Sequence, residues 1–137
     1  MPVPLKVVLD TNLFVSILLG SSRLTPLATL IRSDKVRLIF SPAQIGELTE
    51  VLHRPKFRFP PKEIRELLDW IRLETTLVVP EELPRPVSRD PKDDFLLSTA
   101  VRGGADFVVT RDKDLLVRGS YEGIPILLPE EFISKVT

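Results

Sequence analysis

Carboxylates occupy several positions along the sequence from which they could act together on one substrate. Asp10 and Asp112 each follow a short apolar run, and Glu47 lies in the second turn of a helix expected after the apolar run at 36–40. Asp93 and its neighbour Asp94 fall in the first turn of a further expected helix. Carboxylates that gather at one place repel each other, and they cannot all stay ionised unless a positive charge joins them. The pattern therefore predicts a cation site.

The other residue types narrow the kind of cation. The sequence has no cysteine and a single histidine, His53, so thiolate sites and sites with two histidines are excluded. Ligand sets made only of oxygen suit Mg²⁺ or Mn²⁺ rather than zinc. One or two such ions can bind a phosphodiester, lower the pKa of an attacking water and stabilise the leaving oxygen. Candidate metal ligands are Asp10, Glu47, Asp93, Asp94 and Asp112.

Each acid taken alone also has a structural explanation. Asp10 and Asp112 can cap the helix or turn that follows them, and Glu47 can belong to a solvated helix face. Asp93 or Asp94 can simply favour the dipole of its helix. Their coincidence at successive strand ends is what favours a shared site.

The elements that must position these acids alternate between strand and helix. Short, continuous apolar runs are typical of buried parallel strands, and they occur at 5–9, 36–40, 77–79, 107–109 and 126–128. Helices are expected over 13–19, 24–31, 41–53, 62–73, 90–102 and 129–136, with a Pro-rich loop at 80–89. Parallel sheets of this kind bind ligands at the carboxyl ends of their strands. We therefore expect an α/β fold with helices on both faces of the sheet and the acids at one edge.

The composition restricts the classes of protein to which this sequence can belong. The 137 residues are 43% hydrophobic and 28% charged, which fits one globular domain over 1–137. Lys+Arg and Asp+Glu both number 19, so nucleic acid would have to be held by a local patch or by metal ions. There is no apolar run long enough for a membrane span and no signal peptide, and the lack of cysteine suits a reducing cytoplasm. We expect a soluble, cytoplasmic protein with no membrane partner.

One local basic patch lies between residues 53 and 65, where five basic residues accompany one acid, and Phe57 and Phe59 are interleaved with them. Cations beside aromatic rings suit single-stranded RNA. The alternative is a basic loop whose phenylalanines belong to the core, with His53 capping the preceding helix. Candidate RNA-binding residues are Arg54, Lys56, Arg58, Arg111 and Lys113.

Four segments resemble the PIN-domain family, in particular its VapC-like branch, the toxin components of toxin–antitoxin pairs. They are VVLDTNLFVS at 7–16, SPAQIGELTEVLHRPKF at 41–57, DPKDDFLLSTAVRGGADFVVTRDKDL at 90–115 and IPILLPEEF at 124–132. The resemblance implies a three-layer α/β/α sandwich with a central parallel sheet, Mg²⁺ or Mn²⁺ as cofactor, and cleavage of RNA. It also implies a homodimer that a cognate antitoxin protein neutralises.

The resemblance places three of the family's catalytic acids at Asp10, Glu47 and Asp112. The third acid in chain order has two candidates, because counting back from the glycine–alanine pair gives Asp93 and counting back from Asp112 gives Asp94. Asp93 is favoured, because it shares its helical line with apolar residues and borders the buried face. Asp94 is then expected outside the direct ligand set, or facing a second ion through water. The polar positions that usually support the acids are Thr11, Asn12, Ser16 and Thr110.

Two other functions compete with a metal-dependent endoribonuclease. A phosphatase of the haloacid dehalogenase type would need a second aspartate two residues after the first, and that place is taken by Asn12. A non-catalytic RNA- or protein-binding module on the same fold would be favoured by loss of an acid, and none is lost. The favoured interpretation is a ribonuclease that serves as the toxin of a type II toxin–antitoxin system.

Overall fold

The computed structural model describes residues 3–81 and 89–137. Within these ranges six strands form one sheet in the order β3-β2-β1-β4-β6-β5. The strands are β1 Leu5–Leu9, β2 Val36–Phe40, β3 Thr76–Leu77, β4 Phe107–Val109, β5 Ser120–Tyr121 and β6 Ile124–Leu127. Strands β1, β2 and β4 are confirmed at their predicted bounds, while β3 and β6 each begin and end earlier than predicted. Most of the Pro-rich loop predicted at 80–89 lies outside the described residues.

The sheet is mostly parallel. Strands β3, β2, β1, β4 and β6 pair in parallel with their neighbours, and β5 pairs antiparallel with β6. The predicted central parallel sheet is confirmed, and the antiparallel edge strand β5 is an addition that the sequence did not predict. Glu122 and Gly123 join β5 to β6 with φ values of 50° and 78°, and two successive positive φ angles are the geometry of a tight hairpin turn. The two residues of β5 are too few to show a strand pattern in the sequence.

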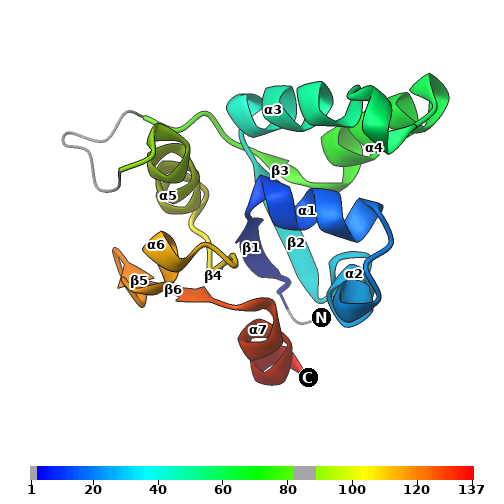
Figure 1. Ribbon diagram of the computed structural model, residues 1–137. Helices are drawn as coiled ribbons and strands as arrows, with labels where there is room; N and C mark the ends of the chain where they lie inside the picture. The colour runs from blue at the N-terminus through cyan, green and yellow to red at the C-terminus, as the bar shows by residue number, and fades with distance from the viewer. Residues whose placement is uncertain (1–2, 82–88) are drawn as a thin grey trace.

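Helices cover both faces of the sheet (Figure 1). They are α1 Thr11–Leu18, α2 Thr25–Ile31, α3 Pro42–Leu52, α4 Pro61–Glu74, α5 Pro91–Gly103, α6 Lys113–Leu116 and α7 Pro129–Val136, with 3-10 turns η1 Ser22–Leu24 and η2 Pro55–Phe57. Apolar side chains of α1, α2, α3, α4 and α7 share one core cluster, and those of α5 and α6 share the other. The predicted α/β architecture with helices on both faces is confirmed.

The alternation of side chains along the strands explains the two core layers. In β1, Val7 and Leu9 belong to the larger cluster, and Val8 between them belongs to the smaller one. Successive side chains of a strand point to opposite faces, so the part of β1 that is covered on both sides, Val7 to Leu9, is apolar at every position. Edge-to-face contact between Phe14 and Phe40, with ring centroids 5.5 Å apart, fixes α1 on β2.

The middle of the sheet is the point at which chain connections diverge. From β1 the chain continues to β2 and β3 on one side, whereas β4 and β6 lie on the other side. The backbone amide of Asp10 donates to the carbonyl of Val109 at 3.0 Å, so the chain segments leaving β1 and β4 remain together. A crevice at the carboxyl ends of strands is expected where the strand order diverges in this way.

No single helix in the described residues is long and apolar enough to cross a membrane. One pair, residues 11–18 and 22–31, meets the criteria of length and composition together, with a bend of 109° between its members.

Candidate active site

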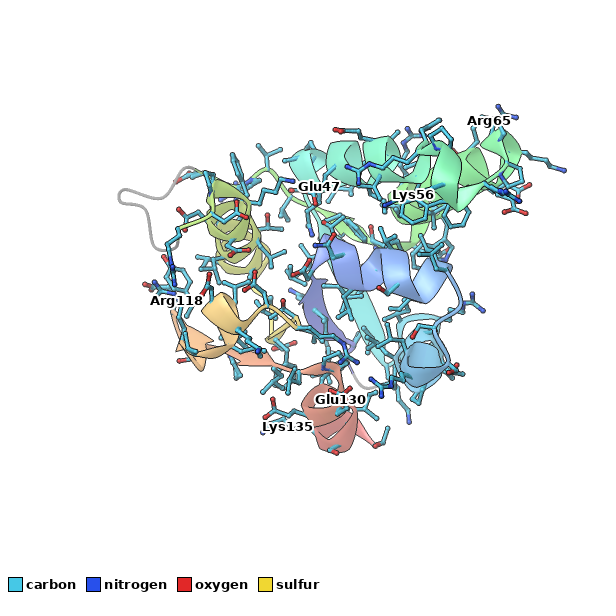
Figure 2. All side chains as sticks on the ribbon, viewed as in Figure 1. Glu47, Lys56, Arg65, Arg118, Glu130 and Lys135 are labelled. Atoms are coloured by element: carbon cyan, nitrogen blue, oxygen red, sulfur yellow. The ribbon has the colours of Figure 1, made fainter. Side chains whose placement is uncertain are left out.

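A pocket of about 340 Å³ opens where the chain leaves β1 and β4. Its walls come from the start of α1, from α3, from the start of α5 and from the turn after β4. Figure 2 shows Glu47 on the side of α3 that faces α1 and α5. The acidic residues of the lining are Asp10, Glu47, Asp90, Asp93 and Asp112. The structure thus brings four of the predicted acids to one pocket, and Asp94 is not part of the lining.

The hydroxyl of Thr110 connects two of these acids. Thr110 is fully buried at the end of β4, and its Oγ1 donates to Asp10 Oδ2 at 2.8 Å. The same oxygen accepts a hydrogen bond from the backbone amide of Asp112 at 3.0 Å. One side chain therefore fixes both the orientation of Asp10 and the start of the turn that carries Asp112.

Three of the acids also cap a helix. Oδ1 of Asp10, Asp90 and Asp112 accepts from the backbone amide two residues later, at 3.0, 2.9 and 2.8 Å. Each of these caps uses one carboxylate oxygen, so capping does not prevent the same side chain from lining the pocket. The structural and the functional explanation of these residues are compatible.

Asp93 has the least favourable surroundings for a negative charge. Only 8% of its surface is exposed. Burial, followed by the charges of Asp112, Asp90, Asp10 and Asp114, raises its pKa from 3.8 to about 6. Within the described part of the chain, no cationic side chain pairs with its carboxylate. A cation bound in the pocket would relieve this repulsion.

The donor set fits a hard divalent ion by its chemistry. Every acidic lining residue offers oxygen, which is the ligand that Mg²⁺ and Mn²⁺ prefer. In the described residues no group of three or more Asp, Glu, His or Cys side chains is as close together as the ligands of one metal ion. Binding would thus have to draw carboxylates inward, and Glu47 and Asp93 are the two whose side chains make no hydrogen bond to other described residues.

A buried amide supports the first acid from behind. Gln44 is 6% exposed, lines the pocket and donates from Nε2 to the carbonyl oxygen of Leu9 at 3.1 Å. Its Oε1 is buried and has no hydrogen-bond partner among the described residues, an arrangement that costs about 1–3 kcal/mol. Gln44 therefore holds the end of β1, one residue before Asp10.

Cations reach this pocket from two helix ends. Arg54 at the end of α3 and Lys92 at the start of α5 are part of the lining. Lys56 and Arg58 are exposed but lie outside it. Arg111 is paired with Glu130 at 2.8 Å, and Lys113 is exposed in the first turn of α6. Of the five predicted RNA-binding residues, the structure brings Arg54 alone into the pocket.

The two phenylalanines of the basic segment are half-buried. Phe57 and Phe59 pack against the larger core cluster, with ring centroids 6.3 Å apart, and Lys56 lies over the ring of Phe57 at 5.0 Å. This arrangement agrees with the alternative interpretation of the segment, in which the phenylalanines of a basic loop support the core. His53 is the C-cap residue of α3, with Nδ1 2.7 Å from the carbonyl oxygen of Thr49.

The predicted supporting residues fall into two groups. Thr11 and Asn12 line the pocket, and Thr110 holds Asp10. Ser16 lies one turn further along α1, outside the lining, where its hydroxyl donates to the carbonyl of Asn12 at 3.1 Å.

Sequence reasoning missed Gln44, Lys92 and Phe95, all of which line the pocket. Gln44 could have been found from helical spacing, because it precedes Glu47 by three residues and so shares its helix face. Lys92 and Phe95 flank Asp93 and Asp94, but only the tertiary packing of α5 shows that they border a cavity.

Comparison with known proteins agrees with the fold. A sequence model of a family described as PIN domain matches residues 6–114. Among solved structures, the PIN domain endonuclease Utp24 superimposes with a TM-score of 0.55 at 22% sequence identity, covering 93% of this chain and 86% of that one. No curated protein gives a significant match.

Proposed function

The chain belongs to the PIN domain family, and from that premise we propose that it is a metal-dependent ribonuclease that cleaves single-stranded RNA, with 1–137 acting as one nuclease domain. Family membership supports nuclease activity in general. The observation that carries the proposal is that Asp10, Glu47, Asp93 and Asp112 line the same pocket.

In the proposed reaction these four acids hold Mg²⁺ or Mn²⁺. Such an ion supplies charge stabilisation for the phosphodiester and a water of lowered pKa. Thr110 keeps Asp10 and the turn at Asp112 in fixed positions, so two of the four ligands are oriented before any ion binds. Such positioning matters because a misplaced ligand weakens both metal binding and catalysis. Hydrolysis consumes one water, and no further co-reactant is needed.

RNA would approach along the wall formed by α3 and α5. Arg54 and Lys92 border the acids there and can contact phosphates on either side of the bond to be cut. The net charge of zero means that the protein as a whole gives no general electrostatic attraction for nucleic acid. Affinity for RNA is therefore expected to depend on this pocket and on the bound cation.

The proposal is tested by incubating the purified protein with a fluorescently labelled single-stranded RNA. We expect cleavage with Mg²⁺ or Mn²⁺, loss of cleavage when EDTA removes the ion, and recovery on addition of excess Mn²⁺. Undiminished cleavage in excess EDTA would contradict the metal mechanism. Metal-independent RNA binding without any cleavage would point to the non-catalytic binding module instead.

A second prediction compares basic residues inside and outside the pocket. Arg54→Ala is expected to weaken RNA binding and to reduce the slope of log K against log salt concentration by about 0.7, the value for neutralising one phosphate fewer on a single strand. Lys56→Ala is the matched control, because Lys56 belongs to the same basic segment but lies outside the pocket lining, and it should leave the slope unchanged. If Lys56→Ala changes the slope and Arg54→Ala does not, the RNA follows the basic loop rather than the pocket.

At a finer level we propose that this nuclease is a VapC-like toxin that acts in the cytoplasm as a homodimer and is neutralised by a cognate antitoxin. The four segments that resemble that branch support the proposal, as does a pocket that a protein segment could cover. A small DNA-binding protein encoded in the neighbouring reading frame that co-purifies with this chain and blocks cleavage would support it. A monomer in light scattering would contradict the dimer.

A further inference from the structure

Phe95 differs from the other phenylalanines of this protein. The sequence contains seven, and all of them fall in the described ranges. Three of the others are buried, and three are half-buried against the core. Phe95 keeps 45% of its surface exposed and belongs to neither core cluster. Its ring therefore contributes little to the packing that holds the fold together.

The position of Phe95 distinguishes it from an ordinary exposed apolar residue. Single hydrophobic residues on a surface are common and need no explanation. Phe95, however, lines the acidic pocket together with Asp93. The two residues are about 3 Å apart along the axis of α5 and about 200° apart around it, so their side chains leave the helix in different directions. On the α3 side, Ala43 and Val51 belong to the same lining.

The pocket thus combines three kinds of surface at close range. Its lining contains five acids, the cations Lys92 and Arg54, and the exposed aromatic ring of Phe95. A phosphate can be held by cations and by a metal ion, whereas an aromatic ring offers nothing to a phosphate. What the ring can hold is the flat face of a nucleobase, as in the binding of single-stranded nucleic acids.

We propose that Phe95 forms a nucleobase-binding subsite, in which its ring stacks on the base next to the phosphate that the acids and their cation hold. This inference rests on the proposed function, because it assumes that the pocket receives RNA. Lys92, three residues before Phe95 on the same helix, contacts the backbone phosphate of that nucleotide. Every base has a π-face that can stack on the ring. The subsite therefore adds affinity and fixes the position of the RNA strand relative to the acids, without a preference for one particular base.

The test uses the full chain and a short single-stranded oligoribonucleotide that contains 2-aminopurine, whose fluorescence is quenched by stacking. A phosphorothioate version resists hydrolysis and reports binding in the presence of Mn²⁺. A cleavable version gives KM and kcat separately. The variants are Phe95→Ala, which removes the ring, and Phe95→Tyr, which keeps it. Leu73→Ala is the control, because Leu73 on α4 is also exposed, at 76%, and lies outside the pocket lining.

Phe95→Ala is expected to raise Kd and KM by about 5- to 150-fold, the range for one stacked base, and to abolish the quenching. The kcat at saturating RNA should change by less than the KM, since the ring does not touch the reacting atoms. Phe95→Tyr should restore affinity and quenching, and Leu73→Ala should match the unmodified protein. Thermal unfolding of each variant checks that the fold is intact, as expected for exposed side chains.

The outcomes separate this inference from the proposed function. If the unmodified protein cleaves RNA but Phe95→Ala shows the same KM and quenching, the subsite is wrong and the nuclease proposal stands. If the unmodified protein binds and quenches the oligonucleotide without cleaving it, the subsite stands and the nuclease proposal fails. If Phe95→Ala has normal RNA binding but no longer binds a protein partner, the ring is a protein contact and the subsite is overturned.

Discussion

Replacing Asp93 by asparagine is expected to lower RNA cleavage by about a hundredfold or more and, at the same time, to make the metal-free protein more stable at neutral pH. The loss of activity follows from removing a charged ligand, since even the residues that only orient metal ligands contribute about 10- to 100-fold. The gain in stability follows from the surroundings of Asp93, whose pKa is raised to about 6 by burial and by neighbouring acids.

The sign of the stability change follows from the two pKa values of Asp93. Above pH 6 the carboxyl is ionised in both the folded and the unfolded protein, so the folded state carries the full penalty of the buried charge. A difference between 3.8 and about 6 corresponds to at most about 3 kcal/mol. As the pH falls from 6 towards 4, the folded protein binds the proton first and the penalty disappears. Asp93→Asn should therefore be more stable than the unmodified protein at pH 7 and equally stable at pH 4, measured by urea unfolding in EDTA.

Asp94→Asn is the matched control for this prediction. Asp94 neighbours Asp93 in the same helical turn but does not line the pocket, so its replacement should reduce cleavage much less. About 100° around the helix axis separates the two side chains. A dead Asp94→Asn with an active Asp93→Asn would reassign the third acid. An Asp93→Asn that is inactive but less stable at pH 7 would show that the carboxylate supports the fold rather than straining it.

The second large effect is expected at Asp10, which follows β1, and at Glu47 in the second turn of α3. Asp10→Asn and Glu47→Gln should each reduce Mn²⁺-dependent cleavage by about a hundredfold or more, and each should weaken Mn²⁺ binding measured by calorimetry. The two substitutions differ in the number of hydrogen bonds that they disturb. Asp10 accepts hydrogen bonds from Asn12 and Thr110, whereas the carboxylate of Glu47 accepts none from the described residues.

The stability of the same two variants makes the prediction sharper. Asp10→Asn places an amide against the Thr110 hydroxyl and should cost about 1 kcal/mol of stability, while Glu47→Gln should leave the free energy of unfolding unchanged. Glu50→Gln is the control, because Glu50 is exposed on the same helix and lies outside the pocket lining. Normal Mn²⁺ binding and cleavage by Glu47→Gln would remove Glu47 from the proposed ligand set.

Local patterns along the chain were sufficient to predict most of the elements. Apolar runs gave β1, β2 and β4 at their observed bounds, because the parts of these strands that are covered on both faces are continuously apolar, and only Lys6 and Arg37 interrupt the runs at exposed positions. Helices α3, α5 and α7 begin within one residue of their predicted starts, and each has a proline at its first helical position, where the missing amide hydrogen costs nothing. The two-residue strand β5 was not predicted, because its pairing depends on a hairpin turn and not on a periodic pattern.

The sequence by itself determined the chemistry of the candidate site, because Asp10, Glu47 and Asp112 are tied to strand ends and helix starts that can be recognised locally. The tertiary structure alone decided which neighbours border the pocket. Packing of α5 buries Asp93, leaves Asp94 outside the lining and turns Phe95 towards the cavity. It also buries the phenylalanines of the basic segment in part and brings Arg54 without Lys56 to the acids. The reason is that helix phase fixes only the direction of a side chain, whereas a cavity is made by elements that are distant in sequence and meet only when the sheet is assembled.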